Sequence, residues 1–148
     1  MHNCESLNFA ENKTMTYKEV LPDQCPPSNA DESNLNKVCR FLLFPDNDER
    51  NFHSHKKLGK KIGDACECRA ASVSLFKHDC IPSVLSASKT AFFKNKKICL
   101  LEIPAGSGRH IEKKGHIDFW MYSEYDPKTS IVAILENADE LSEAVEND

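Results

Sequence analysis

The 148-residue sequence lacks any apolar run of the roughly 18 residues needed to cross a bilayer. Its first residues, MHNCESLNF, also lack the basic and apolar segments of a secretory signal. No internal repeat is visible, and no strong catalytic fingerprint occurs anywhere in the chain. These absences predict a protein without a membrane-spanning helix and favour the cytoplasm.

The chain also lacks a regular cysteine framework, because its seven cysteines are odd in number and irregularly spaced. Without an export signal, we expect reduced thiols rather than disulfides. Three close pairs of soft ligands do occur: His53 with His55, Cys66 with Cys68, and His78 with Cys80. Structural zinc sites place about two to four residues between paired cysteines, whereas one residue separates these. A zinc-binding protein stays an alternative, and no residue is assigned to a metal.

What is present is the composition of an ordinary globular domain, with 40% hydrophobic and 28% charged residues. The net charge of −4 favours neither a nucleic-acid binder nor a membrane-surface protein. The charges are unevenly distributed, since residues 50–61 carry bases without any acid and residues 136–148 carry acids without any base. We therefore expect a protein partner, keep a nucleotide as an alternative ligand, and consider nucleic acid and membrane poor candidates.

Hydrophobic patterning predicts the regular structure. Strands are expected at 37–44, 66–76, 97–104, 115–122 and 130–135, a short basic helix over 52–61, and a longer helix over 81–93 capped by Asp79. This pattern indicates an α+β domain, with a mostly antiparallel sheet of about five strands and one main covering helix. The expected organisation is a polar, flexible arm (1–35), the core domain (36–136) and an acidic tail or short helix (137–148).

The segment GHIDFWMY, residues 115–122, carries the clearest alternation in the chain. Ile117, Phe119 and Met121 are expected to face the core. The opposite face is predicted to be a ligand or partner face, and it consists of His116, Asp118, Trp120 and Tyr122. Large amphipathic aromatic side chains favour interfaces and stacking on flat ligands, which supports recognition as the role of this face.

Two further groups of residues are candidates for chemistry. His55, Lys56 and Lys57, together with Arg109 after the turn AGSG, would suit an anion or phosphate, although an ordinary basic hairpin loop has the same composition. His116 and Asp118 are two positions apart on one strand, where a carboxylate can orient an imidazole for acid–base work. The alternative for this pair is simple exposure to solvent or to a partner.

The order of several pieces resembles the ADP-ribosyltransferase-like superfamily. The matching pieces are Arg40 in VCRFLLF, Ser72 and Ser74 in AASVSLF, and the strand and turn ICLLEIPAGSGRHI. The resemblance implies NAD as cofactor, with Arg40 contacting it and the two serines in the same cleft. Val73 stands where that motif has threonine, and no E-x-E or Q-x-E follows the turn.

Our first hypothesis is an intracellular interaction protein that uses the basic segment and the aromatic strand face. Its size and lack of motifs would fit an accessory or regulatory component of a toxin–antitoxin or defence-type system. The alternative is a small nucleotide-acting transferase with Arg40, Ser72, Ser74 and His116 gathered in one cleft. Whether the protein is an enzyme stays open at this point.

Overall fold

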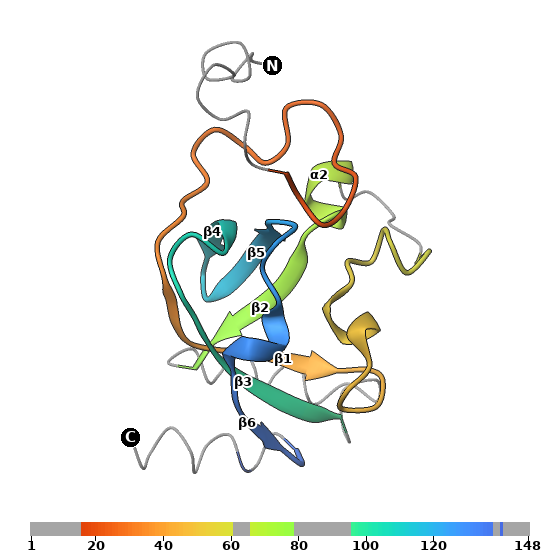
Figure 1. Ribbon diagram of the computed structural model, residues 1–148, viewed down its shortest axis with the longest axis vertical. Coiled ribbons are helices and arrows are strands. Elements are labelled where there is room, and N and C mark those ends of the chain that lie inside the picture. The colour runs from red at the N-terminus through yellow and green to blue at the C-terminus, as the bar shows by residue number, and fades with distance from the viewer. Residues whose placement is uncertain (1–15, 61–65, 79–95, 138–139, 141–148) are drawn as a thin grey trace.

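The computed structural model describes residues 16–60, 66–78, 96–137 and 140 (Figure 1). Its main feature is one six-stranded sheet in which every pairing is antiparallel, with strand order β4-β5-β2-β1-β3-β6. The strands are β1 (Leu35–Leu42), β2 (Val73–Lys77), β3 (Lys97–Ile103), β4 (Gly108–Lys113), β5 (His116–Met121) and β6 (Ile131–Leu135). The mostly antiparallel sheet predicted from the sequence is therefore confirmed.

Helix is sparse in the described residues. The helical elements are the single turn α2 (Glu67–Ala70) and two 3-10 turns, η1 (Glu49–Phe52) and η3 (Pro127–Ser130). The predicted covering helix over 81–93 lies outside the described residues, as does most of the 137–148 tail. One main covering helix is thus not supported, and no helix in the described ranges has the length and apolarity to cross a membrane.

Two segments differ from the sequence prediction. The strand expected over 66–76 divides, because Cys66 caps α2 and only Val73–Lys77 pairs in the sheet. The basic helix expected over 52–61 is wrong for its described part, which consists of turns after η1 with Gly59 at a φ of +76°. That positive φ takes the backbone out of the right-handed helical region.

A sixth strand, β4, occupies residues for which the sequence predicts no strand. It pairs with β5 from Gly108 opposite Met121 to Lys113 opposite His116. Lys114 and Gly115 both have positive φ, which suits a tight hairpin turn between two twisted strands. The short, polar sequence GRHIEK gives little sign of a strand, so only its pairing with the apolar β5 reveals it.

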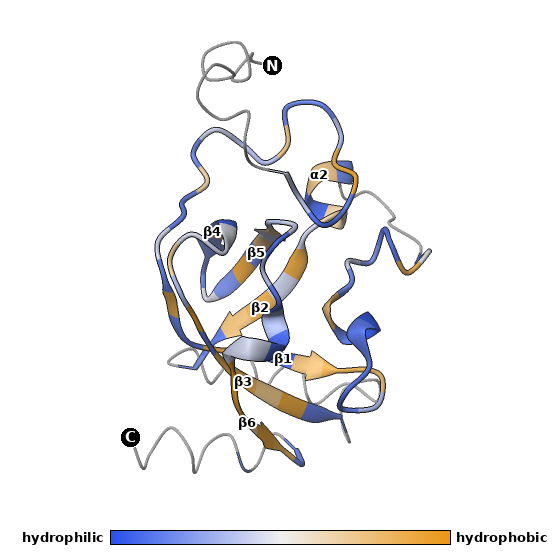
Figure 2. Cartoon of the chain, viewed as in Figure 1, coloured by the Kyte–Doolittle hydropathy of each residue, from blue (hydrophilic) through white to orange (hydrophobic). Residues whose placement is uncertain are grey.

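The hydrophobic core lies along one face of the curved sheet. It includes Val38, Leu75, Leu101 and the predicted core residues of β5, Ile117, Phe119 and Met121. Burial of each large side chain contributes about 1.5–3 kcal/mol, so this cluster stabilises the fold substantially. Apolar colour accordingly follows the strands in Figure 2, while the connecting segments are largely hydrophilic.

Residues 16–34, which the sequence assigns to the N-terminal arm, lie against the sheet. They pass near α2 and then run beside β4 to the start of β1 (Figure 1). Tyr17 forms a bridge with Tyr122, and Asp31 forms one with His110. The first bridge joins residues about a hundred positions apart and the second joins residues about eighty positions apart. Together they fix the path of this segment across the fold.

Candidate functional site

Arg40 lies on β1 and points into the interior, where its side chain is buried. Its guanidinium donates hydrogen bonds to three backbone carbonyls: Asn51 at 2.5 Å, Ser74 at 2.7 Å and His53 at 3.3 Å. Burial lowers the pKa of Arg40 to about 10, which still leaves the side chain charged at neutral pH. The arginine therefore clamps η1 and β2 onto β1, and its donors are occupied by the protein itself.

The neighbouring Asn51 is a buried polar residue that the sequence gives no reason to select. Its Oδ1 accepts hydrogen bonds from the backbone N–H groups of Leu43 and Phe44 at 3.0 and 2.8 Å. Its Nδ2 donates to the carbonyls of Phe44 and Pro45. Asn51 thus satisfies the backbone where β1 ends, and together with Arg40 it forms a structural centre.

A second cluster lies on the outward face of β5 and surrounds the carboxylate of Asp118. Arg69 Nε lies 3.2 Å from Asp118 Oδ2, and His116 Nδ1 lies 3.6 Å from Oδ1. Ser72 Oγ donates to the Arg69 carbonyl at 2.7 Å and lies 3.4 Å from Asp118 Oδ1. We call these four residues the Asp118 cluster.

The chemistry of the Asp118 cluster is limited by its geometry. Burial lowers the pKa of His116; the charge of Asp118 opposes that effect and the charge of Arg69 adds to it. The imidazole is therefore largely neutral at physiological pH. The hydroxyl of Ser72 donates to the Arg69 carbonyl and not to His116, so no nucleophile–base pair is assembled.

The predicted catalytic residues are only partly brought together. Ser74 lies opposite Asp118 in the β2–β5 ladder, so Ser72, Ser74 and His116 share one region of the fold. Arg40 reaches Ser74 through the backbone carbonyl, while its side chain points to the interior. The structure accordingly separates the arginine from the His116 side of the sheet.

The aromatic half of the predicted ligand face is buried, which corrects the expected exposure of Trp120 and Tyr122. Trp120 is 2% exposed, and its indole N–H donates to the carbonyl of Cys68 at 2.9 Å. The hydroxyl of Tyr122 donates to the carboxylate of Glu32. Both side chains are covered by α2 and residues 16–34, which are distant from them in the sequence. The local alternation of residues 115–122 therefore gave no sign that they are buried.

The basic residues of the 50–61 segment lie on a turn whose base is well anchored. Glu19 accepts hydrogen bonds from Ser54 N at 2.9 Å and Ser54 Oγ at 2.5 Å. The Ser54 hydroxyl in turn accepts from the N–H of Lys57. Lys56 N–H donates to the carbonyl of Ala70, which joins the turn to α2.

The side chains of this turn reach the surface. His55, Lys57 and Lys60 are exposed, and Lys56 Nζ lies 3.8 Å from the Glu67 carboxylate. Burial lowers the pKa of His55, with further lowering by Lys60 and Arg40. Arg109, predicted to join this anion site, instead contacts the Ala30 carbonyl and Glu32, and so anchors residues 16–34.

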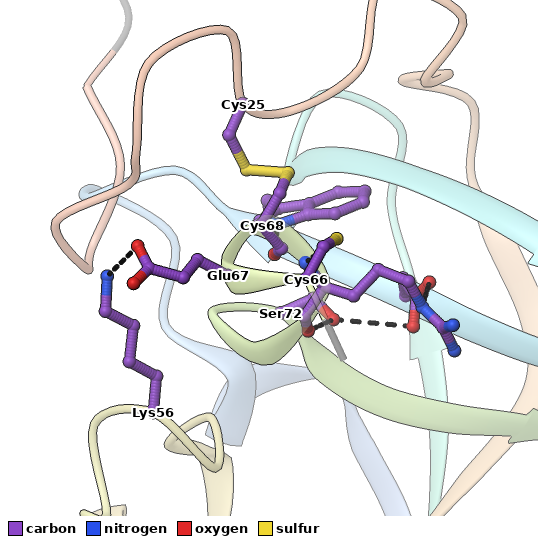
Figure 3. The surroundings of a disulfide bond; sticks show 9 residues. Cys25, Lys56, Cys66, Glu67, Cys68 and Ser72 are labelled. Atoms are coloured by element: carbon purple, nitrogen blue, oxygen red, sulfur yellow. Dashed lines mark hydrogen bonds and ion pairs between the residues drawn. A yellow bond between two sulfur atoms is a disulfide. The ribbon is translucent and has the colours of Figure 1, made fainter. Parts of the chain in front are cut away.

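Cys25 and Cys68 form a disulfide, which corrects the prediction of reduced thiols for this pair. Figure 3 shows the bond joining residues near 25 to α2, beside the Lys56–Glu67 ion pair. The sequence did not indicate it because the partners are 43 positions apart. Disulfides form and persist mainly in oxidising compartments.

The other described cysteines do not form a metal centre. Cys39 and Cys99 are buried thiols whose pKa burial raises to about 12, and Cys66 is exposed. Within the described ranges, no three His, Cys, Asp or Glu side chains are placed to hold a metal ion together. The zinc alternative consequently has no assembled ligand set in this part of the chain.

Comparison of the chain with protein-family models, with curated proteins and with solved structures gives no match in any of the three. The candidate site is therefore defined by its own geometry. The residue that sequence analysis missed is Arg69, because the segment carrying it was predicted to be strand. Only the turn of α2 brings this guanidinium to Asp118, with 3.2 Å between Nε and Oδ2.

Proposed function

We propose that the protein is an interaction protein that binds an acidic segment of a protein partner. The contact surface would be the basic surface, defined as His55, Lys56, Lys57, Lys60 and Arg69. The observation that carries this proposal is the anchoring of the turn by Glu19, Ser54 and Ala70, which presents exposed cations on a fixed base. A preorganised surface loses less conformational entropy on binding.

Charge supports an acidic partner. The basic surface has four permanent positive charges; Lys56 pairs with Glu67, and Arg69 pairs with Asp118. His55 and Lys57 are exposed here, and residues 50–61 contain no acid, although the whole chain has a net charge of −4. Such a local patch increases the rate at which an acidic segment is captured, and a net negative protein is repelled by nucleic acid.

Trp120 and Tyr122 have no part in this proposal, because both are buried. The nucleotide-transfer alternative is not carried forward either. Its arginine would have to hold a cofactor, whereas the Arg40 guanidinium is occupied by three backbone carbonyls. The observations favour recognition through surface charge over chemistry in a cleft.

The test is fluorescence anisotropy of the full chain with a labelled acidic peptide, for which we choose NADELSEAVEND, the sequence of residues 137–148. We expect saturable binding that weakens as salt increases. Lys57→Glu should weaken binding by roughly tenfold, because it replaces an attractive charge with a repulsive one. Lys128→Glu is the matched control, since this exposed lysine lies on η3 and outside the basic surface.

An equal loss of affinity in Lys57→Glu and Lys128→Glu would show nonspecific charge attraction and reject the proposed surface. Absence of peptide binding, with tight and steeply salt-dependent binding of a single-stranded oligonucleotide, would instead assign the surface to nucleic acid. Retention of peptide binding by Lys57→Glu would also overturn the proposal. Circular dichroism of each variant confirms that the fold is intact.

A further inference from the structure

A groove of about 570 Å³ lies between residues 29–36 and the β4 strand, away from the residues of the basic surface. Its polar lining includes Asp31, Asn34, Asn36, Lys77 and Glu112. Leu35 and Val38 from β1 contribute buried apolar surface to the lining. The groove thus combines a polar rim with a partly apolar base.

The backbone of β4 forms one wall of this groove and presents an open edge. His110 N–H donates to the Asp31 carbonyl at 2.8 Å, and Asp31 N–H donates to the His110 carbonyl at 2.9 Å. Since alternate residues of a strand direct their peptide groups to the same side, those of Glu112 must also point away from β5. Among the described residues, the Glu112 peptide groups have no backbone partner on this side.

This edge stays open because residues 16–34 do not continue their pairing with β4. Continuing the antiparallel pairing beyond Asp31 and His110 would bring Asn29 opposite Glu112. Instead, Ala30 N–H donates to the Pro27 carbonyl at 3.0 Å, which forms a turn and ends the pairing after one bridge. The protein therefore shows that this edge accepts an extended segment, and it leaves the next position unpaired.

The side chains around the open edge favour backbone-like and basic groups. Asn34 and Asn36 are exposed amides, each able to donate to and accept from a peptide group. Asp31 and Glu112 contribute two carboxylates, and Lys77 Nζ lies 3.5 Å from Glu112 Oε1. With one lysine against two carboxylates, the rim retains negative charge.

We propose that this groove binds an extended peptide segment of a partner protein, which adds to the β4 edge at Glu112 and bears a basic side chain. The strand addition would use the outward N–H and carbonyl of Glu112, and the amides of Asn34 and Asn36 would hold the far side of the peptide. The site is separate from the basic surface and takes a ligand of opposite charge.

The experiment uses the peptide acetyl-Thr-Val-Thr-Lys-Thr-Val-Thr-amide with the isotope-labelled full chain, followed by amide chemical shifts. We expect saturable shifts at His110, Glu112 and Lys113. The same peptide with N-methylated alternate residues should bind roughly tenfold or more weakly, because it has lost donors that strand addition needs. Acetyl-Thr-Val-Thr-Glu-Thr-Val-Thr-amide tests the charge preference.

Glu112→Pro removes the outward N–H without removing a bond to β5, since proline is tolerated at strand edges where the N–H faces solvent. We expect roughly three- to tenfold weaker binding, the effect of one hydrogen bond. Glu112→Gln keeps the N–H and removes the charge, so it should weaken only the lysine peptide. Glu112→Gln also tests the site if the proline variant does not fold.

Three results would overturn this inference. The first is an absence of shifts in the groove at millimolar lysine peptide. The second is equal binding of the N-methylated and unmodified peptides, which would show that the backbone edge is not used. The third is saturation of the groove by a neutral oligosaccharide such as maltotriose with no peptide binding, which would assign it to a different ligand class.

Discussion

The two arginines on either side of the sheet illustrate how differently one residue type is used. Arg40 is buried, and its three hydrogen bonds go to backbone carbonyls. The side chain of Arg69 is 61% exposed, and it pairs with the carboxylate of Asp118. The first arginine holds segments of the fold together, whereas the second forms an ion pair at the surface.

The role of an arginine therefore cannot be assigned from its sequence neighbourhood alone. Arg40 occurs in an apolar strand and resembles a cofactor-binding residue, yet its surroundings are main-chain acceptors. Arg69 occurs in a short polar segment with no motif, yet it pairs with Asp118 on the surface. The following predictions test whether the interior centre and the surface cluster are as independent as this comparison implies.

The largest effect is expected for Arg40→Met, which retains much of the side-chain length but removes the donors. Three backbone carbonyls would then lack a charged partner, and the free energy of unfolding should fall by about 3–5 kcal/mol. Urea denaturation measures this loss of unfolding free energy. Arg40→Lys is the matched control and should recover part of the loss, because it keeps one charged donor. A loss below about 1 kcal/mol in Arg40→Met would contradict the structural role.

The next effect is expected for Cys25→Ser with Cys68→Ser, which removes the covalent link between residues 16–34 and α2. Loss of a disulfide from a small domain lowers the free energy of unfolding by about 2–4 kcal/mol. The amide chemical shifts of residues around Arg69 and Trp120 should change. Those of residues around Arg40 should stay the same. Equal changes at both arginines would break the proposed independence of the two regions.

A small effect is expected for Arg69→Gln, since an exposed ion pair contributes about 0–1 kcal/mol. The acidic peptide should nevertheless bind this variant more weakly than it binds the original chain. The double-mutant cycle with Asp118→Asn measures the pair directly. A stability loss comparable to that of Arg40→Met would show that Arg69 is a structural clamp as well.

The smallest effect concerns the pH dependence at His116, whose folded-state pKa is lowered. The unfolded chain then binds the proton more readily than the folded chain does, so stability falls as pH decreases below the ordinary value of about 6.5. The slope of unfolding free energy between about pH 7.5 and pH 5.5 should be smaller in His116→Gln. His55→Gln is the comparison, because the pKa of His55 is also lowered. An unchanged slope in His116→Gln would contradict the lowered pKa of His116 in the folded chain.

Local pattern made the strands largely predictable. The segments around β1, β3, β5 and β6 alternate or form apolar runs, and they became strands with Ile117, Phe119 and Met121 in the core. β4 and α2 were not predictable, because their sequences are short and polar. Their conformations depend on pairing with β5 and on the cap at Cys66.

The candidate sites were less predictable than the strands. The basic turn could be named from its lysines, and the proximity of His116 to Asp118 followed from their spacing. The role of Arg69, the hydrogen bonds of Arg40 and the open edge at Glu112 could not be named. Each arises from segments distant in the sequence that meet only in the folded chain.

Local sequence was enough to predict most of the sheet-forming segments, the core face of β5 and the uneven distribution of charge, because these depend on residues a few positions apart. Tertiary structure alone decided that Trp120 is covered, that Cys25 meets Cys68, and that the pairing at Asp31 stops short of Glu112. These outcomes depend on long-range contacts, whose partners are selected by the packing of the whole sheet and not by local propensity.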